Sequence, residues 1–210
     1  LTGRVDDYSN FGSEFTPSVT LLYHASENTS IRALAAQSFR APSFNDLYWP
    51  DEGWTRGNPD LRPEQGTTYE IGFETRASDL IALHATAFRS VYDDLINWEP
   101  AGLVWQPMNV NKARIKGVET GVEFTFTEDI SLDGTFTYSN AINVETGAHL
   151  VYQPEHTFTF AARHADIYGF KVSLNGRWVG HRYNDATNTT KVKHFFVAGL
   201  DLSREFPAGI

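Results

Sequence analysis

The chain has 210 residues, 41% of them hydrophobic and 14% aromatic, which is enough apolar material to exclude wholesale disorder. Its formal net charge of −9 argues against general nucleic-acid binding, which needs a basic surface. Cysteine is absent, so disulfides are excluded, and no apolar run approaches the ~18 residues of a membrane-spanning helix.

From the N-terminus onward, polar and apolar residues alternate with the period of two that is typical of β-strands. Residues 66–77, for example, set Tyr69 and Ile71 against Glu70 and Glu74. Each predicted strand therefore has one apolar face and one polar face. We expect about nine strands, at 1–7, 18–25, 30–38, 66–77, 80–93, 113–127, 130–142, 155–165 and 170–182, with a tenth near 194–205.

The predicted connections alternate between tight turns and long loops, and the long ones lie near 8–17, 39–65, 94–112, 143–154 and 183–193. This alternation indicates an up-and-down antiparallel sheet with two unlike rims, as in outer-membrane barrels. Several strands are also long enough for the ~9–11 residues that a tilted strand needs to cross a bilayer.

A soluble β-sandwich or β-barrel that binds a small hydrophobic ligand also alternates, and periodicity cannot decide which face points outward. Two observations favour the membrane. Tyr138 and Trp178 end their apolar faces near the long-loop rim, where interfacial aromatic residues gather. The other face carries charge on most strands, so a lumen lined by it is wet and wide.

A third possibility, a β-rich glycan hydrolase, depends on pairs of carboxylates. Glu119 and Glu123 share one face of a strand, but four residues at ~3.3 Å each separate them by about 13 Å. Carboxylate pairs in glycoside hydrolases lie ~5–9.5 Å apart. We therefore expect wall carboxylates and no catalytic site. The seven histidines show no metal-ligand spacing, so no metal and no cofactor is expected.

Three stretches carry a resemblance to a known family. Residues 35–74, "AAQSFRAPSFNDLYWPDEGWTRGNPDLRPEQGTTYEIGFE", resemble the signature loop and strand of TonB-dependent outer-membrane receptors. Residues 18–42 resemble the preceding hairpin, and residues 108–124, "MNVNKARIKGVETGVEF", resemble a strand with the pattern N-x-x-x-A-x-x-x-G-[VI]-E. Within the family, cobalamin and siderophore receptors look most similar.

The resemblance implies an all-β, antiparallel transmembrane β-barrel of roughly 22 strands with a plugged lumen. Residues 1–210 are then expected to supply about 9–10 strands, without the plug domain or the closing C-terminal strand. The function implied is TonB-dependent active uptake of a scarce, large nutrient, such as cobalamin or a ferric siderophore, and not an enzyme activity. The location implied is the outer membrane of a Gram-negative bacterium.

The implied partners are outer-membrane lipid and lipopolysaccharide, a small organometallic or macrocyclic ligand, and the inner-membrane TonB energy-transducing complex acting through the plug. No nucleic acid is expected. A haem receptor of the same family is an alternative, because residues 39–42 and 58–61 resemble its two boxes. Residues 43–57 contain no histidine, however, so the expected iron ligand is missing.

The loop before the strand at 66–77 divides into two parts. In "GNPDLRPE", Pro59 and Pro63 restrict the backbone and Gly57 permits unusual dihedral angles, so a rigid structural crossing is expected. The aromatic part suits a planar or macrocyclic ligand, although interfacial anchoring or packing within the loop explains it equally well. The candidate ligand-binding residues are Tyr48, Trp49, Trp54, Arg56, Trp98 and Trp105.

Overall fold

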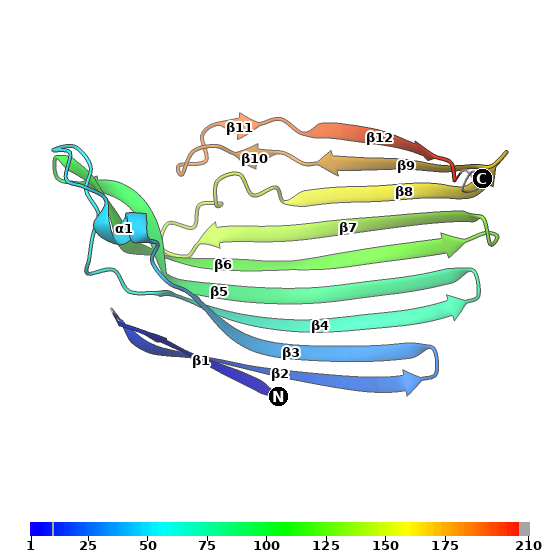
Figure 1. Cartoon of the computed structure of the whole chain (residues 1–210), viewed down its shortest axis with the longest axis horizontal. Coiled ribbons are helices and arrows are strands. Elements are labelled where there is room, and N and C mark those ends of the chain that lie inside the picture. The colour runs from blue at the N-terminus through cyan, green and yellow to red at the C-terminus, as the bar shows by residue number, and fades with distance from the viewer. Residues whose placement is uncertain (10, 206–210) are drawn as a thin grey trace, which may run out of the picture.

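The computed structural model describes residues 1–9 and 11–205, and within them ten strands form one antiparallel sheet in which sequence neighbours pair (Figure 1). The predicted up-and-down sheet is therefore confirmed. A short hairpin, β10 (Arg182–Tyr183) with β11 (Lys191–Val192), and a helix, α1 (Phe44–Tyr48), lie outside the sheet. The strands of the sheet are β1 (Thr2–Tyr8), β2 (Gly12–Ser26), β3 (Thr29–Arg40), β4 (Glu64–Ser78), β5 (Ile81–Ala101), β6 (Val104–Thr125), β7 (Ile130–Asn143), β8 (His156–Ile167), β9 (Phe170–Val179) and β12 (Phe195–Ser203).

Two of the predicted long loops are wrong. Instead of a loop over 94–112, β5 and β6 continue to the pair Ala101–Val104 and turn through two residues, with Gly102 at φ 72°. The prediction failed because register shifts near Leu95 interrupt the period of two. Instead of a loop over 8–17, β2 begins at Gly12, which pairs with Tyr8.

Cross-strand pairing aligns the apolar faces of all strands into continuous rows. One row runs Phe136–Phe158–Trp178–Phe196 across β7, β8, β9 and β12. Pairing places apolar residues of β6, β7 and β9 on this same face, where Leu174 and Phe136 are 44% and 42% exposed. These residues are Val122, Phe124, Leu132, Phe136, Leu174 and Trp178.

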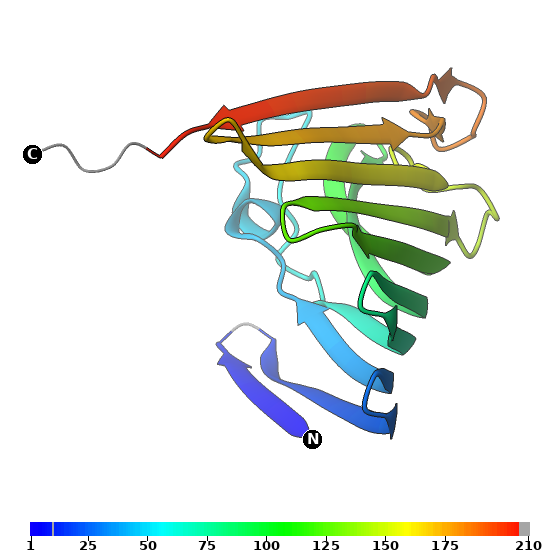
Figure 2. The same ribbon diagram turned by 90° about the vertical axis from the view of Figure 1, so that its right-hand side faces the viewer.

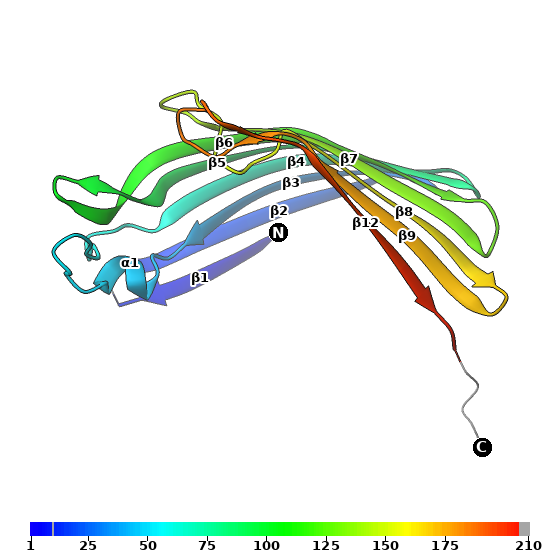
Figure 3. The ribbon, with the colours of Figure 1, turned by 90° about the horizontal axis from the view of Figure 1, so that it is seen from above.

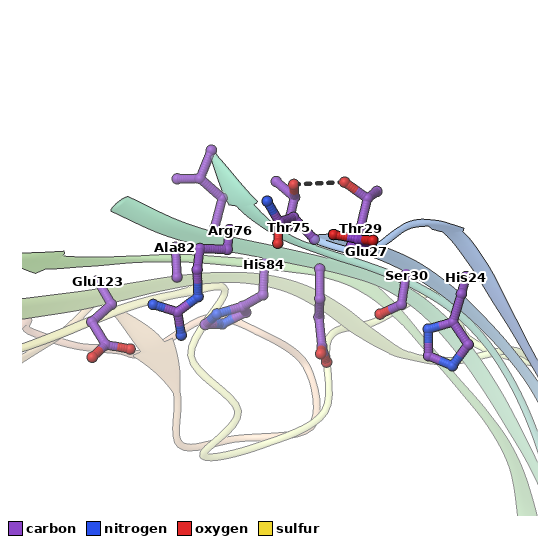
Figure 4. Close-up of a pocket in the computed structure, with 12 residues that line it drawn as sticks. His24, Glu27, Thr29, Ser30, Thr75, Arg76, Ala82, His84 and Glu123 are labelled. Atoms are coloured by element: carbon purple, nitrogen blue, oxygen red, sulfur yellow. Dashed lines mark hydrogen bonds between the residues drawn. The ribbon is translucent and has the colours of Figure 1, made fainter. Parts of the chain in front are cut away.

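The sheet is curved, so that it has a concave and a convex side (Figures 2 and 3). Figure 4 shows His24, His84 and Glu123 pointing to the concave side, whereas Thr29 and Thr75 meet on the opposite side. The apolar rows therefore form the convex surface. This arrangement is that of a barrel wall with an apolar outside and a wet inside, and it excludes the soluble barrel, whose apolar face would point inward.

On the concave face, charged residues of neighbouring strands pair with each other. Arg32 lies 3.5 Å from Glu70, and Arg163 forms an ion pair with Asp133. Glu119, one of the carboxylates considered above, accepts a hydrogen bond from Thr137 at 3.2 Å. These contacts agree with the predicted role of wall carboxylates.

At the long-loop rim, Leu47 and Leu61 of the loop 41–63 form a buried apolar cluster with Ile96 of β5. No helix in the described residues is long and apolar enough to cross a membrane.

Candidate functional site

The loop 41–63 folds back over the long extension of β5 and β6, on the concave side of the sheet (Figures 1 and 3). Its first element is the five-residue helix α1. Ser43 Oγ accepts a hydrogen bond from the Asp46 backbone N at 3.1 Å, and the Asp46 carboxylate accepts one from the Ser43 backbone N at 3.0 Å. This reciprocal pair is a capping box, and it fixes where the loop turns.

Hydrogen bonds then join the loop to β5 and β6. The Trp98 indole N–H donates to the Asp46 carboxylate at 3.1 Å. Further along, the Trp105 backbone N donates to the Trp54 carbonyl at 2.8 Å, and the Arg56 backbone N donates to the Trp105 carbonyl at 3.1 Å. The loop therefore continues the hydrogen bonding of the sheet instead of moving freely above it.

An ion pair closes the base of the loop. Arg40 at the end of β3 binds the carboxylate of Glu64 at the start of β4, with Arg40 Nε 2.7 Å from Glu64 Oε2. Glu64 is only 8% exposed, and its other oxygen accepts a hydrogen bond from the Ile96 backbone N at 2.8 Å. Sequence reasoning missed this pair. Arg40 and Glu64 are register partners, so a correct pairing of the flanking strands would have found them.

The segment 57–64 has the structural role predicted for it. Asn109 of β6 holds Arg62 by two hydrogen bonds of 2.9 Å: its Oδ1 accepts from the Arg62 backbone N–H, and its Nδ2 donates to the Arg62 carbonyl. The reason given for Gly57 was wrong, because its φ is not positive. A Cβ there would lie 2.6 Å from the Trp49 backbone N and 2.7 Å from the Leu47 carbonyl, so only glycine fits.

An aromatic basin opens beside α1. Trp49, Trp54 and Trp98, together with polar residues of the loop, line a hollow of about 420 Å³. Trp49 meets Trp98 edge to face, with ring centroids 6.5 Å apart. Trp54 stays 64% exposed and Trp49 40% exposed. Large aromatic surfaces are thus held in place by backbone contacts yet remain open to solvent, which suits contact with a bulky ligand.

The structure brings three of the six predicted site residues together in the basin and places the other three around it. Tyr48 packs against Phe44, with ring centroids 5.0 Å apart. Trp105 contacts the loop through its backbone and is 50% exposed. The Arg56 guanidinium lies 3.4 Å from the side-chain oxygen of Gln106. Packing within the loop, the other explanation considered, therefore accounts for part of the pattern.

Asp46 is the titratable group at the centre of these contacts. Partial burial by itself raises the pKa of its carboxyl, but hydrogen bonds from Ser43 and Trp98, helped by the positive charge of Arg40, outweigh burial and hold the pKa below its ordinary value. The ionised carboxylate is thus the form that orders the loop.

A second hollow of about 410 Å³ lies on the concave face near the tight turns (Figure 4). His24, Glu74, His84 and Glu123 are among its lining residues. The His84 ring lies over Gly121, where a Cβ would come within 2.1 Å of its Cε1. In the described part of the chain, no three histidine or acidic residues converge to hold a metal ion. These histidines are placed as wall residues.

Comparison with known proteins identifies the family. Residues 1–207 match the family described as TonB dependent receptor-like, beta-barrel. The vitamin B12 transporter BtuB of Photobacterium profundum is 29% identical over 95% of this chain, and that of Vibrio vulnificus YJ016 is 30% identical over 89%. The iron-regulated outer membrane virulence protein of Vibrio cholerae El Tor is 26% identical over 74%.

Solved structures share the fold. The siderophore receptor PirA from Acinetobacter baumannii superposes with a TM-score of 0.80 at 20% identity, covering 98% of this chain and 37% of that one. This chain spans 33% and 30% of the length of the two BtuB relatives. It belongs to the TonB-dependent receptor family and forms part of the β-barrel of an outer-membrane receptor.

Proposed function

We propose that this chain is the section of a TonB-dependent receptor that carries part of its extracellular binding surface, and that the receptor takes up a scarce, large nutrient of the cobalamin type. The plug, on which the inner-membrane TonB complex would act, is proposed to be another part of the receptor. The chain would supply barrel wall on β1–β9 and β12 and ligand contact through the loop 41–63.

The observation that carries the proposal is the aromatic basin. Two of its three tryptophans, Trp49 and Trp54, lie on a loop that is anchored by Arg40–Glu64 at its base and by backbone hydrogen bonds at its tip, and the third, Trp98, lies on β5. Preordered aromatic surface binds a rigid macrocycle at little cost in conformational entropy. The cobalamin assignment is further supported by the names of the two BtuB relatives.

The test uses the full-length receptor in detergent and measures quenching of tryptophan fluorescence by cyanocobalamin, a ferric catecholate siderophore and haemin. We expect cyanocobalamin to bind most tightly. Trp54→Ala should weaken its binding about tenfold, since an exposed aromatic contact at a binding hot spot contributes upward of ~1 kcal/mol.

Trp178→Phe is the matched control, because it removes a tryptophan from the convex face, far from the basin. It should leave the dissociation constant unchanged. Tighter binding of the siderophore would reassign the substrate while keeping the basin. Equal affinities of the Trp54→Ala variant and the native receptor for every ligand would remove the basin from the binding surface.

A further inference from the structure

A third hollow, of about 730 Å³, lies on the concave face toward the long-loop end of β8, β9 and β12. Arg177 and Arg182 both line it, so we call it the cationic hollow. Arg177 alternates with Trp178 of the convex face and therefore points to the concave side. The hollow is larger than the aromatic basin and lies within the size range of small-molecule binding sites.

The two cations of the hollow are not neutralised by its own lining. In the part of the chain that the structure describes, neither Arg177 nor Arg182 takes part in an ion pair. Asp133 also lines the hollow, but its carboxylate is already paired with Arg163. The positive charge of Arg177 and Arg182 is therefore available to a ligand.

Two further carboxylates near Arg182 are also occupied. Asp185, three residues along the chain, accepts three backbone hydrogen bonds from its own loop. Glu155 lies 3.7 Å from a ring nitrogen of His149 and 3.7 Å from one of His181, which precedes Arg182. Neither carboxylate forms an ion pair with Arg182, so the hollow keeps its net positive charge.

An aromatic ring holds Arg182 in place. Its guanidinium lies over Phe195, 5.2 Å from the ring centroid. Its Nη1 is covered by the surrounding chain and has no hydrogen-bond partner among the described residues. A guanidinium that is neither paired nor fully hydrated gains most from an anion, because the anion supplies charge-assisted hydrogen bonds. Arg182 is therefore positioned in advance for an anionic ligand.

The walls beside the two cations are apolar. Phe195 pairs with Val179 across β12 and β9, and Val197 pairs with Arg177. Phe195 is 41% exposed and Val197 57% exposed, although both belong to the concave face. An inorganic anion would leave this apolar surface wet, whereas an organic anion would cover it. The hollow therefore suits an anionic group that is attached to a larger apolar body.

We propose that the cationic hollow binds the phosphodiester group of the nutrient, the group that joins the corrin ring of cobalamin to its nucleotide. This inference rests on the proposed function and deepens it, because it assigns the anionic group of the ligand to one hollow and apolar contact to the other. Guanidinium groups complement phosphate oxygens in geometry as well as in charge. The aromatic basin does not suit this group, since the carboxylate of Asp46 lines it.

The experiment uses the full-length receptor in detergent and compares cyanocobalamin with dicyanocobinamide, which keeps the corrin ring but lacks the phosphate and the nucleotide. Quenching of tryptophan fluorescence measures the binding of each. R177Q/R182Q should weaken cyanocobalamin binding about 25-fold, at about fivefold per cation. It should leave dicyanocobinamide binding unchanged. R177K/R182K, which keeps both charges, should retain most of the affinity for cyanocobalamin.

R76Q is the matched control, because it removes a cation from the same face near the tight turns, outside the cationic hollow (Figure 4). It should leave the affinity for both ligands unchanged. The inference is overturned if R177Q/R182Q weakens both ligands equally, since the cations would then order the barrel or its plug and not bind phosphate. It is also overturned if R177K/R182K binds cyanocobalamin as weakly as R177Q/R182Q.

The same measurements separate this inference from the proposed function. A native receptor that binds neither corrinoid would overturn both. Native binding of cyanocobalamin that R177Q/R182Q leaves unchanged would overturn this inference alone. Should the double variant fail to fold, R177Q alone must show the fivefold loss, because the Arg177 side chain is exposed and forms no ion pair within the described chain.

Discussion

On the convex face of the sheet, Leu21 and Ile71 are 68% and 57% exposed. At the rim, the loop 41–63 and the parts of β5 and β6 that it contacts form what we call the loop assembly, and there Leu47 and Leu61 are 6% and 5% exposed. Both regions contain leucine and isoleucine side chains, but the sheet is surrounded by lipid and the loop by water. In the sheet, lipid replaces the second layer that a water-soluble sheet would need. The loop 41–63 stands in water and must build a core of its own.

The difference also explains how each region is ordered. The sheet is ordered by backbone hydrogen bonds between its strands and by the bilayer. A convex side chain can therefore be replaced by another apolar side chain without loss of order. Specific contacts order the loop assembly: the ion pair of Arg40 with Glu64, the capping box of α1 and the three-residue core. A single substitution in the sheet should therefore change stability through the polarity of the new side chain. A single substitution in the loop should change stability through the contacts that it removes.

The largest effect is expected from a charge on the convex face. Phe136→Arg should destabilise the full-length receptor in a bilayer by ~2–4 kcal/mol, because the guanidinium would lie in hydrocarbon. Urea unfolding in lipid vesicles measures this loss. Thr135→Arg, its neighbour on the concave face, should cost little. If the two variants were equally stable, the assignment of the faces would be wrong.

Truncating the core of the loop assembly should cost somewhat less. Leu47→Ala should lose about 2 kcal/mol, the low end for a buried leucine, because the cluster is small. Since 1.4 kcal/mol is tenfold, the amides of Gly57 and Asn58, which bond to the carbonyls of Trp49 and Asp46, should exchange about 30-fold faster with deuterium.

Leu103→Ala is the control for that variant, because Leu103 lies at the tip of the same rim but is 99% exposed. Exchange of the loop amides should be unaffected by it. A global loss of stability in Leu47→Ala, with the sheet amides exchanging faster as well, would show that sheet and loop assembly are not independent.

The difference between the two regions is also the difference between what could and could not be predicted. The sheet follows from the period of two, since each strand repeats one apolar and one polar face. The boundaries failed where this signal is interrupted, as at Leu95, or where turn-forming residues lie within a strand, as at Gly12. Which face pointed outward required the curvature of the whole sheet.

In the loop assembly, residue type indicated the site but not its construction. Tryptophans in a long loop predicted an aromatic surface, and Trp49, Trp54 and Trp98 do line one hollow. The contacts that hold them, such as Trp98 with Asp46, join residues 52 positions apart. No local pattern encodes such a contact. The helix α1 was missed for a related reason, since five residues are too few for a helical period to show.

The smallest expected effect comes from the charge of Asp46, which should make the order of the loop, unlike that of the sheet, depend on pH. Because the folded-state pKa of Asp46 is lowered below its reference value of 3.8, ionisation stabilises the loop above that pH, and this contribution is lost as pH falls through the folded-state pKa. Asp46→Asn should reduce protection of the Asn58 amide about fivefold at neutral pH, as for a weakened helix cap. The ratio of native to variant protection should approach one in acid. Arg40 and Glu64, the nearby charged groups, are present in both proteins and cancel in that ratio. A ratio that stays constant from neutral pH into acid would mean that the charge of Asp46 does not order the loop.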